Sequence, residues 1–483
     1  MNKTFRSVCA SVVLLFCITQ CFAASSAGES KASSFQYMKK LNSVFDYVEQ
    51  NYVDELDPKI LYEGAIKGML DAIGDPYTVY LDPEYMRDLN DTTEGSFGGV
   101  GLSISKAIES TPEKPAYVEV ASPIEDTPGQ RAGIQAGDLI TAIDGLPTPD
   151  MTMNEVLGKL RGKIGEPVTV TIRRGANMNF DVTLIRALIE VPTVKYGMIG
   201  KTGYMRLIQF TPETPHRVQE ALDSFEKNKY ENMIIDLRDN PGGLITSVTE
   251  IADKFIDNGP IVSTKSRLVF ENQVFKASPS KTIAHTKNKP IVVIINRGSA
   301  SASEILSGAL KDNHLAILVG ERTYGKGSVQ QVIPLSEVDG IKITMARYYT
   351  PSDTNIDKVG IPADVEVTYP KLTEEDEKAY VDLIKDNKIE DYVLKHVKMT
   401  EADIAEFAKE LRKTYPLEER LLRRLIRNQV NKTEVAALYD LDYDIQLGRA
   451  LEILESSQYA TILKEAKTLK ELQDEVKLEG EKK

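Results

Sequence analysis

Two short segments of this sequence hold residue types that could act together in catalysis. In the first, 296–305, three serines alternate with alanines where a helix is expected to begin. In the second, 318–330, Lys326 stands between two glycines. A serine and a lysine that meet in a dry pocket can serve as nucleophile and base, the roles of serine and histidine in other hydrolases. The two segments therefore predict covalent catalysis by a serine.

Ser301 is the first candidate for the nucleophile. The apolar run 291–295 predicts a buried strand, and a helix is predicted over 301–312 directly after the short loop that follows it. A helix N-terminus favours the negative charge that develops on an attacking oxygen. The same position also suits a serine that only caps the helix. One cap is sufficient, however, so three serines favour a catalytic role, with Ser299 and Ser303 left as alternatives to Ser301.

Lys326 is the candidate base. A lysine must be neutral to accept a proton, so burial must lower its pKa, and Gly325 and Gly327 allow the backbone to approach closely. The alternative is a phosphate-binding loop, because Gly320, Gly325 and Lys326 have its spacing. Gly327 stands where that loop needs a serine or threonine for magnesium, and 328–333 reads as a strand rather than a helix. The nucleotide-binding interpretation is therefore disfavoured.

A glycine-containing turn at 239–243 is the third element of the predicted site. It follows the apolar run 233–237, which predicts a buried strand, and precedes a helix predicted over 244–256. The backbone N–H groups of Gly242 and Gly243 could face an oxyanion that develops during acyl transfer. Taken alone, the turn is an ordinary strand-to-helix connection.

Composition excludes some classes of function. The 483 residues suffice for roughly two to four domains. A net charge of −13 argues against nucleic acid, whose binding needs clustered basic residues. The four histidines lack the spacing of metal-binding motifs, so neither a metal nor another cofactor is expected.

The N-terminus has the features of a secretory signal peptide over 1–23. Lys3 and Arg6 precede an uncharged stretch with an apolar centre, and small residues follow it. An uncleaved membrane anchor and lipid attachment at Cys21 are alternatives. All three cysteines fall in this segment, so the mature protein is expected to lack disulfides. The expected location is periplasmic or otherwise extracytoplasmic, with membrane association left open.

Short predicted strands and one amphipathic helix, 152–161, fill the segment from about Gly95 to Arg186. Backbone N–H groups in a glycine loop can gather around a terminal carboxylate while a peptide pairs with the neighbouring strand. A glycine loop at 99–102 and the Ala-Gly-Ile-Gln-Ala-Gly-Asp segment at 132–138 make this part of the chain resemble a PDZ domain. The loop residues expected to bind peptide are Gly99, Val100, Gly101 and Leu102.

Taken together, these motifs resemble the C-terminal processing, or tail-specific, proteases, a secreted serine peptidase family with a PDZ domain. The resemblance covers roughly residues 35–370. Further matching motifs lie at 62–70, 75–83, 203–210, 236–243 and 346–351. The segment 351–357 departs from the usual turn of the family, and the charged tail after 371 is long.

The resemblance implies a role for several residues. Ser301 would be the nucleophile, Lys326 the base, and Gln330 the residue that holds the lysine. The N–H of Ala302, with that of Gly242 or Gly243, would form the oxyanion hole. Arg161 matches an arginine that links PDZ position to activity in relatives, although an arginine that ends a helix also suits the helix dipole.

The expected fold is a multidomain α/β protein, in which a mixed α/β protease core carries an inserted PDZ β domain, N-terminal helices and a helical C-terminal extension. The predicted boundaries are 1–23 for the signal peptide, 24–94 for the N-terminal helices, 95–187 for the PDZ domain, 188–370 for the protease core and 371–483 for the charged helical region.

The expected function is an endopeptidase that recognises exposed protein C-termini through the PDZ domain and cuts with a Ser-Lys dyad. The main alternative is a catalytically silent PDZ scaffold that binds tails without cutting, and a nucleotide hydrolase is third. The sequence leaves open an adaptor or activator protein, and also a homodimer or higher oligomer.

Overall fold

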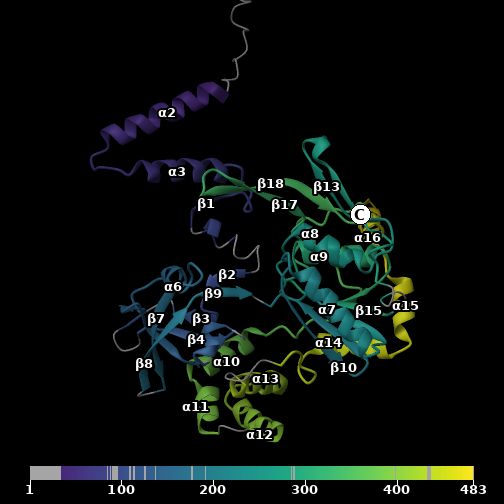
Figure 1. Ribbon diagram of the computed structural model, residues 1–483. Helices are drawn as coiled ribbons and strands as arrows, with labels where there is room; N and C mark the ends of the chain where they lie inside the picture. Colours follow the sequence, from purple (N-terminus) through teal and green to yellow (C-terminus); the bar gives the residue numbers. More distant parts are fainter. Residues whose placement is uncertain are drawn as a thin grey trace, which may run out of the picture. The chain divides into compact units, whose positions relative to one another are not determined.

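In a computed structural model of the protein, the chain divides into two compact units, Met1–Tyr80 and Leu81–Lys483 (Figure 1). The predicted signal peptide lies outside the described residues. These are 34–481 except 84, 88, 90–95, 108–109, 112–114, 125–126, 136, 176–177, 191, 284–285, 287–288, 397–398 and 432–436.

The first unit contains two helices, α2 (Ser34–Asn51) and α3 (Pro58–Asp71). Asp57 caps α3, because its carboxylate accepts a hydrogen bond from the Lys59 N–H at 2.9 Å. Strand β1 (Val79–Leu81) spans the boundary between the units. Within the described ranges, no helix is long and apolar enough to cross a membrane.

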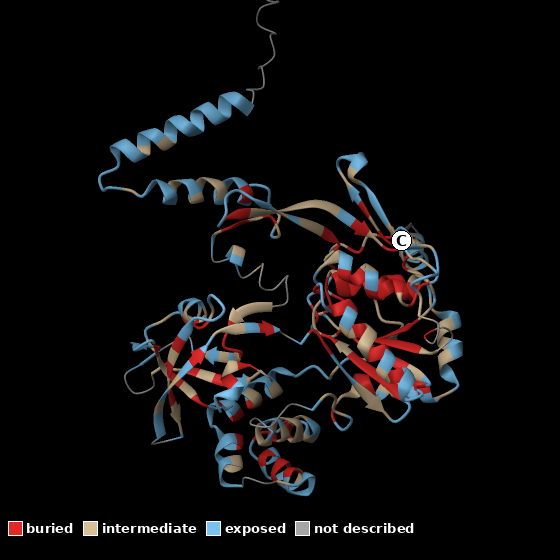
Figure 2. Ribbon diagram, in the orientation of Figure 1, coloured by how far each residue is buried: buried red, intermediate tan, exposed pale blue. Residues whose placement is uncertain are grey.

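The segment expected to be a PDZ domain forms a six-stranded antiparallel sheet with its own buried core (Figure 2). The predicted helix is present, and Thr152 and Glu155 form a capping box at its start. The strands of this sheet are β3 (Leu102–Lys106), β4 (Val118–Pro123), β5 (Leu139–Ile143), β6 (Leu146–Pro147), β7 (Pro167–Arg174) and β8 (Met178–Ile185). The helices are α5 (Pro128–Arg131) and α6 (Met153–Leu160). Strands β2 (Ser96–Gly99) and β9 (Ala187–Glu190) pair in a separate two-stranded sheet.

A turn separates the first two strands of this segment. Strand β2 ends at Gly99 and β3 begins at Leu102. Gly101 adopts a φ of +73°, and a Cβ at this position would lie 2.2 Å from the Cβ of Thr127. The chain therefore turns at a glycine that no other residue could replace without displacing its neighbour.

The α/β core is a three-layer arrangement around a six-stranded sheet in the order β10-β11-β12-β15-β16-β19, parallel except for β10 with β11. Successive strand residues face opposite sides, so Ile235 and Val293 join a core with α7, α8 and α9, while Ile234 and Val292 join a core with α14. The elements are β10 (Val194–Ile199), β11 (Thr202–Leu207), α7 (Thr214–Lys227), β12 (Asn232–Asp236), α8 (Ile245–Asp253), β15 (Ile291–Ile295), α9 (Ala302–Asp312), β16 (Ile317–Gly320) and β19 (Val365–Glu366).

A second sheet carries the segment after Lys326. Residues 328–333, predicted as a strand, lie in β17, which pairs antiparallel with β18. This confirms the expectation that separated the lysine turn from a phosphate-binding loop, whose lysine precedes a helix. The elements are β13 (Pro260–Ser266), η1 (Val269–Glu271), β14 (Gln273–Lys276), β17 (Ser328–Pro334) and β18 (Gly340–Tyr349).

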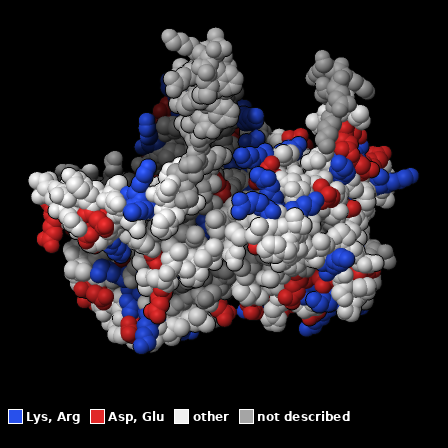
Figure 3. Space-filling model, turned by 90° about the horizontal axis from the view of Figure 1, so that it is seen from above, with Lys and Arg blue, Asp and Glu red and all other residues white. Residues whose placement is uncertain are grey.

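The C-terminal region is helical, as expected, but has two different parts. Helices α10 to α13 enclose a core of their own, whereas α14 buries Leu447, Ala450 and Ile453 against the central sheet. Acidic and basic side chains both occur across the face shown in Figure 3. The helices are α10 (Glu374–Lys385), α11 (Lys388–Lys395), α12 (Glu401–Arg412), α13 (Glu419–Val430), α14 (Ile445–Glu455), α15 (Gln458–Glu465) and α16 (Leu469–Glu481).

Candidate active site

Ser301 has an unusual backbone conformation at the N-terminus of α9. Its φ is +56° and its ψ is −113°, a region that residues other than glycine rarely occupy. An ordinary capping serine has extended backbone instead. Strained backbone of this kind concentrates at functional sites and persists only where the surroundings hold it. The geometry therefore distinguishes Ser301 from a simple helix cap.

The neighbouring serines have structural contacts. Ser299 and Ser303 are fully buried, and their hydroxyls donate to the carbonyl oxygens of Leu237 at 2.8 Å and Asn240 at 2.9 Å. Ser301 is only half-buried. Of the three serines left open by the sequence, Ser301 is thus the most exposed.

Glu304 joins the serine to the lysine turn. Its Oε2 accepts hydrogen bonds from the N–H of Ser301 at 2.9 Å and from that of Lys326 at 2.8 Å. Its Oε1 accepts from the Gly325 N–H at 2.8 Å and from the Thr323 hydroxyl at 2.6 Å. The side chain is fully buried, and burial raises its pKa although these donors act in the opposite direction. One carboxylate thereby holds both candidate catalytic residues by their backbones.

Tyr348 makes a second connection between the two residues. This buried side chain extends from β18, and its hydroxyl contacts the carbonyl oxygens of Ser301, at 3.2 Å, and Lys326. The N–H groups of Ser301 and Lys326 thus share the Glu304 carboxylate, and their carbonyl oxygens share the Tyr348 hydroxyl. The structure thus brings the backbones of the two predicted residues together, and contact between their side chains stays a prediction.

Neither Glu304 nor Tyr348 was assigned a role from the sequence. A serine followed three residues later by a glutamate is the signature of a capping box, and this signal could have drawn attention to Glu304. Tyr348 lies in the matching motif 346–351, but nothing in its local pattern indicates which backbone it contacts.

The environment of Lys326 favours its neutral form. Burial lowers the pKa of Lys326, the positive charge of Lys342 lowers it further, and Glu304 acts in the opposite direction. A lysine with a lowered pKa can accept a proton closer to neutral pH. This property suits the role of base.

The lysine turn is a poor site for phosphate. The N–H groups of Gly325 and Lys326 donate to the Glu304 carboxylate, and that of Gly327 donates to Asp357 Oδ1 at 3.1 Å. A phosphate-binding loop needs such N–H groups for its anion. The structure therefore argues against the nucleotide-binding alternative.

Gln330 lies on β17, after the lysine turn. Its amide nitrogen donates to the hydroxyls of Ser328 at 2.9 Å and Thr344 at 3.3 Å. These contacts orient the amide within the second sheet. The contact between Gln330 and Lys326 that the resemblance implies stays a prediction.

The glycine turn lies directly against the serine. Gly242 has a φ of +105°, and a Cβ there would lie 2.7 Å from the Ser301 Cβ and 2.9 Å from the Ala302 nitrogen. The Gly242 N–H donates to Asn240 Oδ1 at 2.9 Å. The structure therefore places Gly242 beside Ser301 and Ala302, with the Gly242 donor occupied inside the turn, whereas a Cβ on Gly243 would meet Phe210.

The predicted PDZ residues lie in one stretch that joins β2 to β3. Val100 is buried, and its carbonyl accepts from the Gly129 N–H at 2.8 Å. Arg161 follows α6 and places its guanidinium 4.7 Å from the centre of the Phe97 ring. Their proposed roles in peptide binding and regulation stay predictions. Across the ranges the structure describes, no group of three or more His, Cys, Asp or Glu side chains could hold a metal.

Three family models match this chain. The one described as Peptidase family S41 matches residues 201–367, and the PDZ domain model matches 119–174. A third, described as Activating protease CtpB N-terminal domain, matches 19–85. The class that these matches define is a serine peptidase with a PDZ domain.

Curated relatives identify the family within that class. The carboxy-terminal-processing protease of Bartonella bacilliformis is 40% identical over 72% of this chain and 79% of its own length. The carboxy-terminal processing protease CtpA of Bacillus subtilis is 32% identical over 72% of this chain and 71% of its own length. A photosystem II D1 C-terminal processing protease structure is 30% identical, with a TM-score of 0.41 over 70% of this chain and 94% of that one. This chain belongs to the carboxy-terminal-processing protease family, which confirms the resemblance seen in the sequence.

Proposed function

We propose that this serine peptidase is an extracytoplasmic endopeptidase that cuts with Ser301 as nucleophile and Lys326 as base. The observation that carries the assignment is the Glu304 carboxylate, which binds the backbones of both residues. The positive φ of Ser301 and the lowered pKa of Lys326 support the two roles. The signal-peptide pattern of 1–23 supports the location.

In the proposed reaction, neutral Lys326 accepts the Ser301 proton as the hydroxyl oxygen attacks the scissile carbonyl. The protonated lysine then donates to the leaving amine, and water hydrolyses the acyl-enzyme. The N–H of Ala302, with that of Gly242 or Gly243, stabilises the oxyanion. Use of Gly242 requires its N–H to leave Asn240 Oδ1. The Gln330 carbonyl oxygen is the atom that accepts from the lysine.

Substrate recognition is assigned to the PDZ segment. The loop Gly99 to Leu102 receives the C-terminal carboxylate of a protein, and Arg161 couples PDZ position to activity. The support comes from the PDZ match and from relatives whose names specify carboxy-terminal processing. An activating partner and self-association through the N-terminal helices stay predictions, with the match to an activating-protease N-terminal domain as support.

The proposed function is tested with an unfolded protein that has an apolar C-terminal tail. The full-length enzyme should cleave it, and Ser301→Ala or Lys326→Ala should each lower kcat by at least about 10³-fold. The same substrate with an amidated C-terminus should be cut with a lower kcat/KM, because the PDZ loop loses its carboxylate.

Undiminished cleavage by either variant would contradict the dyad. If the wild-type protein bound the tail but neither cut it nor reacted with a serine-directed probe, the scaffold alternative would be correct instead.

A further inference from the structure

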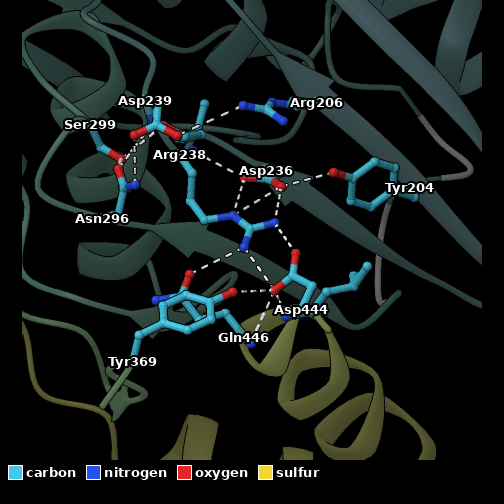
Figure 4. Close-up of polar contacts among 12 residues, drawn as sticks. Tyr204, Arg206, Asp236, Arg238, Asp239, Asn296, Ser299, Tyr369, Asp444 and Gln446 are labelled. Atoms are coloured by element: carbon cyan, nitrogen blue, oxygen red, sulfur yellow. Dashed lines mark hydrogen bonds and ion pairs between the residues drawn. The ribbon is translucent and has the colours of Figure 1, made fainter. Parts of the chain in front are cut away.

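The C-terminal helical region contacts the strand end from which the glycine turn departs (Figure 4). Asp444, the N-cap of α14, accepts hydrogen bonds from Arg238: Nη1 donates to its Oδ1 at 2.9 Å and Nη2 donates to its Oδ2 at 2.6 Å. Arg238 follows β12 and lies 206 positions earlier in the chain. A residue of the C-terminal extension is therefore paired with Arg238, the residue that directly precedes the glycine turn 239–243.

Arg238 is held from two sides. Its Nε donates to Asp236 Oδ1 at 2.9 Å, and its Nη2 donates to Asp236 Oδ2 at 2.6 Å. Asp236 is fully buried and also accepts from the Tyr204 hydroxyl at 2.8 Å. On the other side, Nη1 donates to Gln446 Oε1 at 3.2 Å in addition to Asp444. Because a guanidinium is a rigid fork of donors, carboxylates on both sides fix its position and its tilt.

The pair is shielded from water. The side chains of Arg238 and Asp444 are 12% and 15% exposed. Burial alone would raise the pKa of Asp444, but the hydrogen bonds and charge of Arg238 outweigh it and leave the pKa below its usual value. Asp444 is consequently ionised across the pH range in which a lysine base operates.

The backbone leads directly from this pair into the turn. The Arg238 N–H donates to Asp236 Oδ1 at 3.0 Å, and the next residue, Asp239, has a φ of +59°. The Asp239 N–H donates to Asn296 Oδ1 at 3.0 Å. A residue other than glycine at positive φ depends on its surroundings to keep that conformation. Arg238 directly precedes Asp239. The turn that follows brings Gly242 against Ser301.

We infer that Asp444 is a positioning residue for the peptidase reaction. It touches no reacting atom; it holds Arg238, which fixes the start of the turn 239–243 beside Ser301. This inference rests on the proposed function of that turn as an oxyanion site. Because the turn stabilises the transition state rather than the bound tail, loss of Asp444 lowers kcat and leaves KM nearly unchanged.

The test is Asp444→Asn in the full-length enzyme. Asparagine is an equally good N-cap, so α14 keeps its start while the charged partner of Arg238 is lost. We expect kcat to fall by about tenfold, less than the 10²–10³-fold loss of a direct oxyanion donor, with KM within about twofold. The rate at which a fluorophosphonate phosphonylates Ser301 should fall by the same factor as kcat.

The matched control is Asp442→Asn. It makes the same charge change two residues earlier, at a side chain that is 61% exposed and pairs with Arg427. This control should keep the wild-type kcat. Thermal unfolding of both variants shows whether they are folded at the assay temperature.

Wild-type kcat in Asp444→Asn would overturn the inference, and so would an equal loss in both variants. A loss of kcat that disappears after correction for the folded fraction would also overturn it. The Ser301→Ala variant separates the two proposals. If Ser301→Ala cleaves normally, the proposed function fails. If Ser301→Ala is inactive but Asp444→Asn keeps the wild-type kcat, only the role of Asp444 is rejected.

Discussion

At the scale of single residues, the candidate site is organised through the backbone. Ser301 and Lys326 share Glu304 as an acceptor for their N–H groups, and both carbonyls contact Tyr348. Backbone anchoring fixes where each side chain begins. Such an arrangement suits a nucleophile and a base that must exchange a proton during turnover.

The charge of Lys342 should contribute to the pH dependence of the enzyme. Burial is the main cause of the lowered Lys326 pKa, and repulsion by Lys342 adds to it. In Lys342→Gln that repulsion is lost, protonated Lys326 becomes more stable, and its pKa rises. The ascending limb of kcat/KM should therefore move to higher pH, measured as a pH–rate profile.

An exposed lysine in the second sheet provides the control. Lys276→Gln, on β14, removes the same charge and should leave the ascending limb in place. An unchanged limb in Lys342→Gln would show that Lys326 is not the group that titrates.

At the scale of elements, α9 depends on the sheet that it covers. Residues 302–311 are all buried, and Lys311 near its end pairs with Asp364, which also accepts from the Leu318 N–H at 2.8 Å. The side chains of the pair are 1% and 6% exposed. Breaking a buried pair costs more than the pair contributes, because one charge is left without its partner.

Lys311→Met should destabilise the protein by about 3–5 kcal/mol, because it leaves the Asp364 carboxylate buried and uncompensated. Denaturant unfolding measures the change. In the control, Lys201→Met breaks an exposed pair with Glu231 and should cost at most about 1 kcal/mol. Equal effects of the two substitutions would contradict the role given to the buried pair.

Local patterns predicted most of these elements but not their distant contacts. The strand 291–295 agrees with β15, and the helix predicted over 301–312 differs from α9 by one residue. An apolar run of that length signals a buried strand by itself. The hydrogen bonds between Arg238 and Asp444 join residues 206 positions apart, and no local sequence pattern predicts them.

At the scale of the molecule, the chain contains several separate hydrophobic cores. The PDZ segment, the helices α10 to α13 and the two faces of the central sheet each enclose their own. The C-terminal extension was expected to be a charged helical region. It is helical, and α14 in addition brings Asp444 to the base of the glycine turn. Residues that support the candidate site therefore come from the C-terminal region as well as from the protease core.

The most direct test of the central assignment is to locate the serine that a fluorophosphonate modifies covalently in the intact enzyme. The full-length protein is treated with a fluorophosphonate, digested and mapped by mass spectrometry. The adduct should lie on Ser301, should form much more slowly in Lys326→Ala, and should persist in Ser299→Ala and Ser303→Ala variants that remain folded. An adduct on Ser299 or Ser303, or a rate independent of Lys326, would contradict the Ser301–Lys326 dyad.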